Sequence, residues 1–430
     1  MATIRKIYDL FREYPIVTTD TRNCTPGSLF FALKGDHFNG NAYVEQALEK
    51  GCAYAITDEE DKAVNDRIIY VQDGLQTLQD LARFHRVQLG LPVIGITGTN
   101  GKTTTKELLA AVLSTQYNVL YTQGNLNNHI GVPLTLLQLK PEHELAIIEM
   151  GANHPGEIKT LSEIALPDYG LITNVGKAHL EGFGSFEGVV STKGELYDFL
   201  RKTGGKAFVD HDNPHLTSLA KKIDKVYYGK TPDSFVWGGL KELTPYVTLE
   251  WHCSEGDYLI NTQLIGVYNI NNVLTATAVG KFLGIYPENI NRAIEGYAPQ
   301  NNRSQWQKSA HNELFIDAYN ANPTSMMAAL ESFREVKAPR KALILGDMKE
   351  LGENSREEHR KIVDYILREM AVDQVFLCGP CFKEMASEGM NAYETTEALL
   401  SALDEEPLSG YFVLIKGSRS MNLEKTIEKL

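Results

Sequence analysis

The chain has 430 residues, of which 43% are hydrophobic and 23% are charged, and its formal net charge at pH 7 is -13. This is the composition of a globular protein of roughly three domains, at about 150 residues each. The acidic balance excludes nucleic-acid binding as the main task, and also docking on an anionic membrane, because both need clustered basic residues.

The sequence carries no signal for a membrane or for an oxidising compartment. No stretch approaches the roughly 18 apolar residues of a membrane span, and the opening segment "MATIRKIYDLFREYP" mixes charges without an apolar signal core. Five cysteines without framework spacing predict free thiols, so we expect a protein of the reducing cytoplasm. The motif "CGPC" at Cys378 and Cys381 has no second pair to complete a zinc site, and we interpret it as a strand end and a turn.

Short apolar strands alternate with helical patterns along the chain, which predicts an α/β protein with parallel sheets. Residues 1–88 hold a strand-helix-strand unit in "GSLFFALKG", "YVEQALEKG" and "CAYAIT". The segment "LGLP" then opens a second region, residues 89–298. The third, residues 299–430, contains the strands "ELFIDAY", "KALILGD", "QVFLCG" and "YFVLIKG". We expect three domains: a small N-terminal α/β domain, a central parallel-sheet domain with a phosphate loop, and a C-terminal Rossmann-like domain.

The segment "IGITGTNGKTTTKE" predicts a strand, a phosphate loop and a helix. Glycines let backbone N–H groups close on phosphate oxygens, and the helix N-terminus adds partial positive charge. Lys102 is expected to reach the β- and γ-phosphates and Thr103 to offer its hydroxyl to Mg²⁺. The spacing is tighter than GxxxxGK[ST], and the alternative is a glycine-rich turn before an ordinary helix. The predicted phosphate-binding residues are Gly98, Thr99, Asn100, Gly101, Lys102, Thr103 and Thr104.

Two polar side chains follow buried strands in the same region. In "ELAIIEMGANHPGE", four apolar residues end in Glu149, and the carboxyl end of a strand is where α/β sheets bind ligands. Because buried carboxylates are rarely without a partner, Mg²⁺ is the favoured interpretation, against a glutamate in solvent. His179 comes just after the strand "YGLITNV", where it is a candidate ligand or else a structural histidine.

Five motifs together resemble the Mur ligases of peptidoglycan synthesis, in the family's order and over essentially the whole chain. They are "GTNGKTTTK", "GNLNNHIGVPLTLL", "EMGANHPGEI", "NVGKAHLEGFGS" and "DAYNANPTSM". Within the family, the chain resembles the members that add D-alanyl-D-alanine to UDP-N-acetylmuramoyl-tripeptide. These are peptide synthases of the EC 6.3.2.10 type. The resemblance implies an enzyme that uses ATP and Mg²⁺ and makes an acyl phosphate. It also implies that domains one, two and three bind the UDP-sugar, ATP and the amino component, respectively. Separately, we expect a monomer.

The resemblance also implies the metal-binding and catalytic residues. Glu149 and His179 match family positions that bind metal. Lys193, in "STKGEL", matches a lysine that carries a carbamate. A free lysine, with a pKa near 10.4, is cationic and would repel Mg²⁺, whereas a carbamate is an anion. The alternative is an exposed lysine at a helix start. With Lys102, these residues form the implied catalytic set, and with Thr103 they form the implied metal set.

Further residues are matched to the nucleotide and the two substrates by the same resemblance. The nucleotide set adds Asn269, Asn272, Arg303, Asp317, Tyr319 and Asn320 to the phosphate loop. The substrate set is Thr21, Arg22, Lys34, Phe38, Asn39, Asn125, Asn127, Asn128, Asn322, Lys416 and Arg419. Lys416 and Arg419 are matched to the dipeptide's carboxylate, with a solvated basic loop as the alternative. The sequence departs from the family at four positions. Thr21 replaces the serine of the common "DSR", and Asn39 replaces the aspartate of "FDG". Asn302 replaces the glycine of "GR", and Tyr268 stands where histidine is common.

Other functions stay open at this point. One rival is another ligase of the superfamily, which adds the third stem residue or adds glutamate to folate. The segments "NANP" and "LGDMKELGE" favour the dipeptide-adding enzyme. A rival of another class is an ATP-gated binding protein that has lost catalysis. Whether the tripeptide ends in lysine or diaminopimelate is left open.

Overall fold

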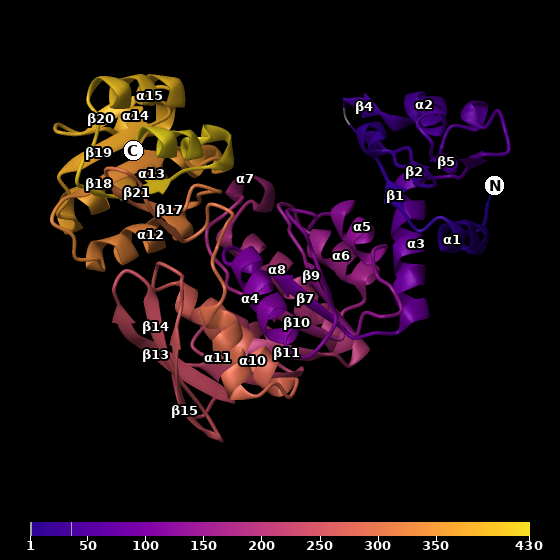
Figure 1. Cartoon of the computed structure of the whole chain (residues 1–430), viewed down its shortest axis with the longest axis horizontal. Coiled ribbons are helices and arrows are strands. Elements are labelled where there is room, and N and C mark those ends of the chain that lie inside the picture. Colours follow the sequence, from indigo (N-terminus) through magenta and orange to yellow (C-terminus); the bar gives the residue numbers. More distant parts are fainter. Residues whose placement is uncertain (1, 36) are drawn as a thin grey trace.

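The computed structural model describes residues 2–35 and 37–430 and contains three main sheets, each the core of one unit. Figure 1 shows the first unit in indigo and the third in orange to yellow on either side of the central one. The three-domain α/β architecture expected from the sequence is confirmed. Within the described residues, we find no helix with the length and apolarity needed to cross a bilayer.

The first unit has a parallel sheet in the order β1-β2-β5-β6, and a short antiparallel hairpin, β3 with β4, extends from it. Its strands are β1 (Val17–Thr18), β2 (Leu29–Phe31), β3 (Lys34–Gly35), β4 (Phe38–Asn39), β5 (Tyr54–Thr57) and β6 (Ile68–Tyr70). Its helices are α1 (Ile4–Glu13), α2 (Val44–Glu49) and α3 (Gly74–Leu89). The apolar face of α3 packs on α1 and also on helices of the central unit, so its core is shared between the two units.

The central unit has nine strands in the order β15-β14-β13-β12-β11-β10-β7-β9-β8. They are β7 (Val93–Thr97), β8 (Val119–Tyr121), β9 (Leu145–Glu149), β10 (Tyr169–Ile172), β11 (Lys206–Asp210), β12 (Asp224–Gly229), β13 (Val236–Leu243), β14 (Val247–Cys253) and β15 (Gly256–Asn261). The helices are α4 (Lys102–Leu113), α5 (Gly131–Leu136), α6 (Glu157–Ala165), α7 (Leu180–Phe183), α8 (Phe186–Thr203), α9 (Pro214–Leu219), α10 (Asn269–Phe282) and α11 (Pro287–Glu295).

The parallel sheet expected for this unit is present from β8 to β13, and β14 and β15 extend it in the antiparallel sense. This antiparallel extension differs from the purely parallel sheet expected from the sequence. Its signal is visible in Val247–Cys253, where buried and half-buried residues alternate, because one face of an antiparallel strand meets the core and the other meets solvent.

The third unit has six strands in the order β16-β17-β21-β18-β19-β20, all parallel except the pair β16 and β17. The strands are β16 (Gln305–Lys308), β17 (Glu313–Ile316), β18 (Lys341–Gly346), β19 (Gln374–Cys378), β20 (Asn391–Tyr393) and β21 (Phe412–Lys416). The helices are α12 (Pro323–Glu335), α13 (Ser355–Glu369), α14 (Pro380–Met385) and α15 (Thr396–Glu405), and a 3-10 helix, η4, spans Gly352–Asn354.

The register of the central sheet places the ends of three strands side by side. Ile96 of β7 pairs with Glu149 of β9, and Thr97 pairs with Ile172 of β10. All five residues of β7 and of β9 are buried, so these strands are fixed in the middle of the sheet. The segments that follow them, including the loop from β7 to α4, therefore meet at one edge, where parallel sheets bind ligands.

Candidate active site

The loop between β7 and α4 has the backbone that the sequence predicted for a phosphate loop. Gly98 and Gly101 have φ angles of 142° and 78°, which favour glycine. A Cβ would lie 2.1 Å from Thr173 Oγ1 at position 98 and 2.5 Å from Asn272 Oδ1 at position 101, so the space also demands glycine. Helix α4 begins at Lys102, and its free N–H groups suit an anion at this end.

The end of β10 braces this loop. Asn174 Oδ1 accepts a hydrogen bond from Asn100 N at 2.9 Å, and Asn174 Nδ2 donates to Asn100 O at 2.9 Å. Thr173 Oγ1 also donates to Asn100 O, at 2.6 Å. Lys102 Nζ donates to the carbonyl oxygens of Gly98 and Thr99 at 2.8 and 3.0 Å. Burial lowers the pKa of Lys102 to about 8.

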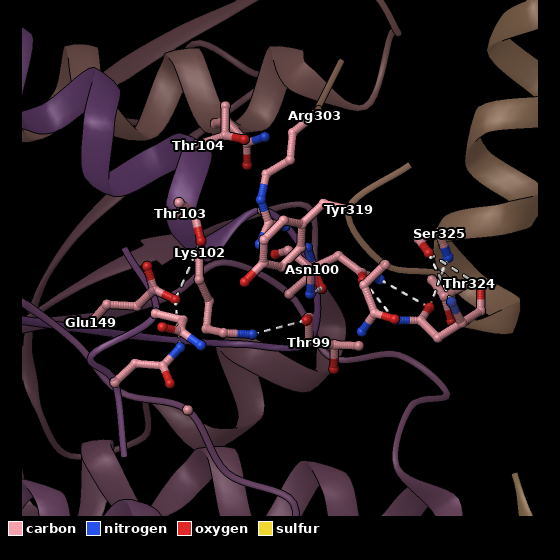
Figure 2. Close-up of a pocket in the computed structure, with 18 of the residues that line it drawn as sticks. Thr99, Asn100, Lys102, Thr103, Thr104, Glu149, Arg303, Tyr319, Thr324 and Ser325 are labelled. Atoms are coloured by element: carbon pink, nitrogen blue, oxygen red, sulfur yellow. Dashed lines mark hydrogen bonds between the residues drawn. The ribbon is translucent and has the colours of Figure 1, made fainter. Parts of the chain in front are cut away.

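A cavity of about 710 Å³ lies between the central and third units and contains most of the predicted nucleotide site. Figure 2 shows its lining, with Lys102 and Glu149 from the central unit and Arg303 and Tyr319 reaching in beside them. The predicted residues that line it are Thr99, Asn100, Gly101, Lys102, Thr103, Thr104, Asn125, Asn127, Asn128, Glu149, His179, Asn269, Asn272, Arg303, Asp317, Tyr319, Asn320, Asn322 and Lys416.

Glu149 has the environment expected of a metal-binding carboxylate. Its side chain is buried, and Oε1 accepts hydrogen bonds from Asn127 Nδ2 at 2.9 Å and Thr103 Oγ1 at 3.3 Å. Oε2 has no hydrogen-bond partner among the described residues, and the nearest charge is Lys106 Nζ at 3.9 Å. A buried oxygen with open lone pairs, beside the Thr103 hydroxyl, fits a hard cation such as Mg²⁺. Glu149 is not a glutamate in solvent.

His179 lines the same cavity, where the carboxylate of Glu350 contacts its Nδ1 atom. It has a φ of 50° and precedes α7. Burial lowers the pKa of His179 and outweighs the opposing influence of Glu350, which favours the neutral imidazole that can bind a metal.

Lys193 lies within α8 and outside the lining of the cavity. Its side chain is buried, with Nζ donating to Ala152 O at 3.1 Å and lying 5.2 Å from the centroid of the Phe183 ring. Burial, and after it the charge of Lys102, lowers the pKa of Lys193 to about 7. The interpretation as an exposed lysine at a helix start is therefore wrong.

The third unit contributes a stacked cation and a buried ion pair. The guanidinium carbon of Arg303 lies 3.6 Å from the centroid of the Tyr319 ring, which holds the arginine in place. Asp317 Oδ2 pairs with Lys416 Nζ at 2.5 Å, and Lys416 also donates to Asn320 O at 3.2 Å. Because Lys416 is buried, the interpretation as a solvated basic loop is wrong for this residue.

The two asparagines predicted for the nucleotide lie on α10, and Asn272 connects that helix to the phosphate-loop helix. Asn272 Oδ1 accepts from Thr105 Oγ1 at 3.1 Å, and Asn272 Nδ2 donates to Asn269 Oδ1 at 2.8 Å. Both side chains are buried at the edge of the cavity. Near them, the Tyr268 hydroxyl is hydrogen-bonded to Ser304 Oγ at 2.9 Å.

Direct hydrogen bonds connect the phosphate loop to the third unit. The amides of Asn100 and Asn322 bond in both directions, at 2.8 Å from Asn322 Nδ2 and 3.4 Å from Asn100 Nδ2. Asn322 also caps α12 by accepting from Ser325 N. Thr324 Oγ1 accepts from Lys177 N at 2.9 Å. The site is therefore built by both units in contact.

Eight predicted residues lie outside the cavity lining. Gly98 belongs to the phosphate loop without lining the cavity, Lys193 is buried in α8, and Arg419 is exposed with its guanidinium carbon 5.4 Å from the centroid of the Tyr319 ring. The other five belong to the first unit: Thr21, Arg22, Lys34, Phe38 and Asn39. These first-unit residues stay predictions.

The charged first-unit residues have partners of their own. Arg22 pairs with Asp20 at 2.7 Å, and Lys34 pairs with Asp58 at 3.0 Å. The Phe38 ring stacks on Tyr43, with centroids 5.4 Å apart, and it is exposed.

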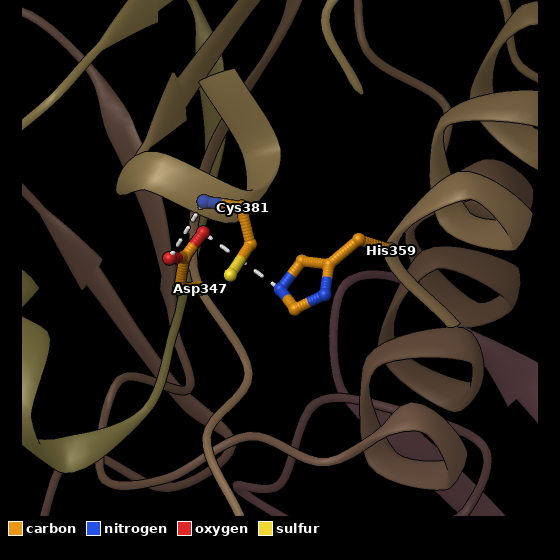
Figure 3. A group of neighbouring side chains, drawn as sticks. All are labelled: Asp347, His359 and Cys381. Carbon is orange, nitrogen blue, oxygen red and sulfur yellow. Dashed lines mark hydrogen bonds and ion pairs between the residues drawn. The ribbon is translucent and has the colours of Figure 1, made fainter. Parts of the chain in front are cut away.

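A second cluster of possible metal ligands, Asp347, His359 and Cys381, is explained by its hydrogen bonds (Figure 3). Asp347 accepts from the backbone N–H groups of Cys381 and Phe382 at 3.1 and 2.9 Å, so it caps α14. His359 Nε2 accepts from Met348 N at 3.0 Å while Nδ1 donates to Ser355 O at 2.7 Å. Since the imidazole lone pair is already used, we interpret the cluster as structural. The motif "CGPC" begins at a strand end as predicted, but Cys381 lies in α14 and not in a turn.

Several residues of the cavity are not among those predicted from the sequence. They are Gly124, Gly151, Ala152, Asn153, Glu157, Asn174, Tyr268, Asn271, Ser304, Thr324, Ser325, Ala328 and Glu350. Asn174 and Glu350 had a usable signal, because each is a polar residue shortly after a buried strand. Thr324 and Ser325 follow the predicted Asn322, and their place in the cavity depends on the packing of two units.

A glycine-constrained loop before a helix, an open carboxylate on the next strand and an arginine from another unit define a nucleotide-binding α/β protein. Three family models match the chain: "Mur ligase family, catalytic domain" at residues 13–86, "Mur ligase middle domain" at 96–280 and "Mur ligase, glutamate ligase domain" at 302–419. The chain belongs to the Mur ligase family.

Individual relatives match along the whole chain. It is 35% identical over 426 residues to the UDP-N-acetylmuramoyl-tripeptide--D-alanyl-D-alanine ligase of Bacillus subtilis, covering 96% of this chain and 92% of that one. Its fold matches MurF from Acinetobacter baumannii with a TM-score of 0.89, 31% identity and coverage of 100% and 98%. It also matches the MurF ligase from Thermotoga maritima in complex with ADP, with a TM-score of 0.88, 26% identity and coverage of 98% and 97%.

Proposed function

We propose that this protein is an ATP-dependent ligase that adds D-alanyl-D-alanine to UDP-N-acetylmuramoyl-tripeptide, a cytoplasmic step of peptidoglycan synthesis. The observation that carries the proposal is the cavity that joins the phosphate loop and Glu149 to Arg303 and Asp317 of the third unit. The full-length relatives named above support the choice of this activity over the other ligases of the superfamily.

In the proposed reaction, the terminal carboxylate of the tripeptide attacks the γ-phosphorus of ATP and ADP leaves. The amine of the dipeptide then attacks the carbonyl carbon, and the C–O bond to phosphate breaks. Lys102 and the backbone N–H groups of the phosphate loop would hold the triphosphate, and Arg303 would reach it from the third unit. Tyr319 would keep Arg303 in position. The base would lie against Asn269 and Asn272.

Glu149, Thr103 and His179 would hold Mg²⁺, which when bound screens the repulsion between the γ-phosphate and the attacking carboxylate. Lys193 would carry the carbamate. A lysine that is buried and has a lowered pKa has a neutral amine available to add carbon dioxide, and the resulting anion suits a position near a cation.

The division of labour between the units is also proposed. Residues 1–88 would bind the UDP-sugar, residues 89–298 would bind ATP, and residues 299–430 would bind the dipeptide and close over the nucleotide. Asn125, Asn127 and Asn128 would position the tripeptide, and Asn322 would contact the acceptor. We expect the protein to act as a monomer.

A phosphate-release assay with each substrate omitted in turn tests the proposal. We expect release only when ATP, UDP-muramoyl-tripeptide and D-alanyl-D-alanine are all present, with the ligated pentapeptide detected by mass. Running the assay with lysine- and diaminopimelate-containing tripeptides identifies the third residue. ATP hydrolysis without either cell-wall substrate would instead favour a nucleotide-gated binding protein.

A further inference from the structure

The loop between β18 and η4 brings a third-unit carboxylate, Glu350, into the cavity opposite the phosphate loop. Its φ angle is 62°, in the left-handed region that a residue with a side chain rarely adopts. A strained residue persists only where the surrounding structure determines its conformation, and such residues concentrate at functional sites.

Contacts on both sides of Glu350 determine the conformation of this loop. Met348 N donates to the buried His359 Nε2 at 3.0 Å, and Lys349 N donates to Ser418 Oγ at 2.9 Å. Leu351 is buried in the third-unit core, and Glu181 N of the central unit donates to Glu350 O at 3.4 Å. The loop is therefore held as a rigid support, and it aims the carboxylate at the site.

The other carboxylates that line the cavity already have defined tasks. Glu149 accepts from Thr103 and Asn127 on the metal side. Asp317 is paired with Lys416. Glu157 accepts the backbone N–H groups of Asn153 and His154 at 2.7 and 2.9 Å.

Glu350 differs from these three carboxylates. Its side chain is 56% exposed, and within the described part of the chain it is paired with no lysine or arginine. One oxygen contacts the ring of His179. The remaining lone pairs of the carboxylate are therefore available to a cationic ligand that enters from the open side of the cavity.

We propose that Glu350 binds the amino group of the incoming dipeptide and sets the enzyme's preference for an amine acceptor; this inference rests on the proposed function. A peptide α-amino group has a pKa of about 7.7 to 8.0, so it enters mostly as an ammonium at neutral pH. A carboxylate held by a rigid loop recognises that ammonium through a charge-assisted hydrogen bond. Contact with His179 keeps the carboxylate oriented. The bound ammonium gives one proton to the Glu350 carboxylate, and the neutral amine that results is presented to the acyl phosphate held by the central unit, where the C–N bond forms and the C–O bond to phosphate breaks.

The test compares two nucleophiles in Glu350→Gln. D-alanyl-D-alanine enters as a cation, whereas hydroxylamine is uncharged at neutral pH and traps the acyl phosphate as a hydroxamate. We expect kcat/KM for the dipeptide to fall about 10- to 100-fold more than the rate of hydroxamate formation, mainly through KM. Glu353→Gln is the matched control, because Glu353 lies in the same loop region, is exposed and loses the same charge. Its ratio of the two rates should stay at the wild-type value.

A binding measurement covers the case in which Glu350→Gln turns over too slowly. Wild type should bind D-alanyl-D-alanine more tightly than the analogue with hydroxyl in place of the amino group, and Glu350→Gln should bind the two about equally. Equal losses with both nucleophiles, or undiminished preference for the amine in the variant, would overturn the role of Glu350. Failure of wild type itself to form any hydroxamate would instead count against the proposed function.

Discussion

The Nζ atom of Lys177 lies 2.8 Å from Oε1 of Glu358, and this ion pair joins the central unit to α13 of the third unit. The Glu358 side chain is 8% exposed, so its carboxylate is shielded from solvent. Lys361 also contacts Glu358, at 3.0 Å, but from the same helix. Lys177 is thus the residue of this group that acts between units, two positions before His179.

Removing this connection should weaken the closed arrangement of the two units. We expect Lys177→Ala to raise KM for ATP about 3- to 10-fold, because the nucleotide needs Lys102 from one unit and Arg303 from the other. Steady-state kinetics gives the KM values, and small-angle X-ray scattering reports the spread between the units. Lys361→Ala is the control, since it changes the same glutamate's partners without breaking a contact between units. An unchanged KM in Lys177→Ala would show that this pair does not contribute to closure.

The buried pair of Asp317 and Lys416 makes a prediction that separates stability from binding. Asp317→Ala leaves the Lys416 ammonium unpaired, with 2% side-chain exposure, and should cost about 3–5 kcal/mol of unfolding free energy. It should also raise KM for ATP more than KM for the dipeptide, because Asp317 belongs to the predicted nucleotide set. The double variant Asp317→Ala with Lys416→Met should regain most of the stability but not the ATP affinity.

Urea denaturation and steady-state kinetics measure the two effects of these variants. The exposed pair of Asp404 and Lys429, at 2.8 Å in the same unit, is the control, and Asp404→Ala should cost less than about 1 kcal/mol. A larger rise in KM for the dipeptide than for ATP would assign Asp317 to the acceptor site.

The sequence predicts the phosphate loop and Glu149 well because their signals are local. An apolar run that ends in a glycine turn or a carboxylate marks a buried strand and its carboxyl end, and the register of β7 and β9 then brings the two segments together. The family motifs likewise placed Arg303 and Asp317, which line the same cavity.

Other features depend on packing and could not be predicted from the sequence. The ion pair between Lys416 and Asp317 joins the last residue of β21 to the residue that follows β17, and the Glu350 contact with His179 joins two units. Neither has a spacing that a single chain segment reveals. Antiparallel β14 was missed for a different reason, since its alternating pattern is present in the sequence but lies outside the motifs on which the prediction rested.

The carbamate proposed on Lys193 has a direct spectroscopic test. Wild type incubated with ¹³C-bicarbonate should show a carbamate carbonyl signal by ¹³C NMR, and Lys193→Ala should lack it. The same variant should lose at least about 100-fold in kcat, with added bicarbonate unable to restore it, because the metal loses an anionic neighbour. Lys202, exposed in the last turn of α8, is the control: Lys202→Ala should keep both the signal and the activity. Near-normal turnover of Lys193→Ala would remove the carbamate role.

Asp210, at the end of β11, predicts how stability depends on pH. Its carboxylate is buried, where it accepts from Asn271 Nδ2 and Asp212 N, each at 3.0 Å. Burial raises its pKa to about 6 from the ordinary value of 3.8. Between these values the folded state binds more protons than the unfolded state, so this residue's contribution falls as pH rises through that window. Above the folded pKa, the buried ionised carboxylate lowers the unfolding free energy by an amount that no longer changes with pH.

Asp210→Asn removes this titration. The unfolding free energy of the variant minus that of wild type should therefore increase by on the order of 2 kcal/mol between pH 4 and pH 7.5. Any hydrogen bond to Asn271 that asparagine fails to make has the same energetic cost at both pH values. Comparing the difference at the two pH values therefore cancels this cost. Urea denaturation at the two pH values measures this change in the difference. Asp66→Asn, at an exposed position, is the control, and its difference from wild type should change by less than about 0.5 kcal/mol between the two pH values. A difference that stays constant or decreases with pH would mean that Asp210 is already ionised in the folded protein at pH 4.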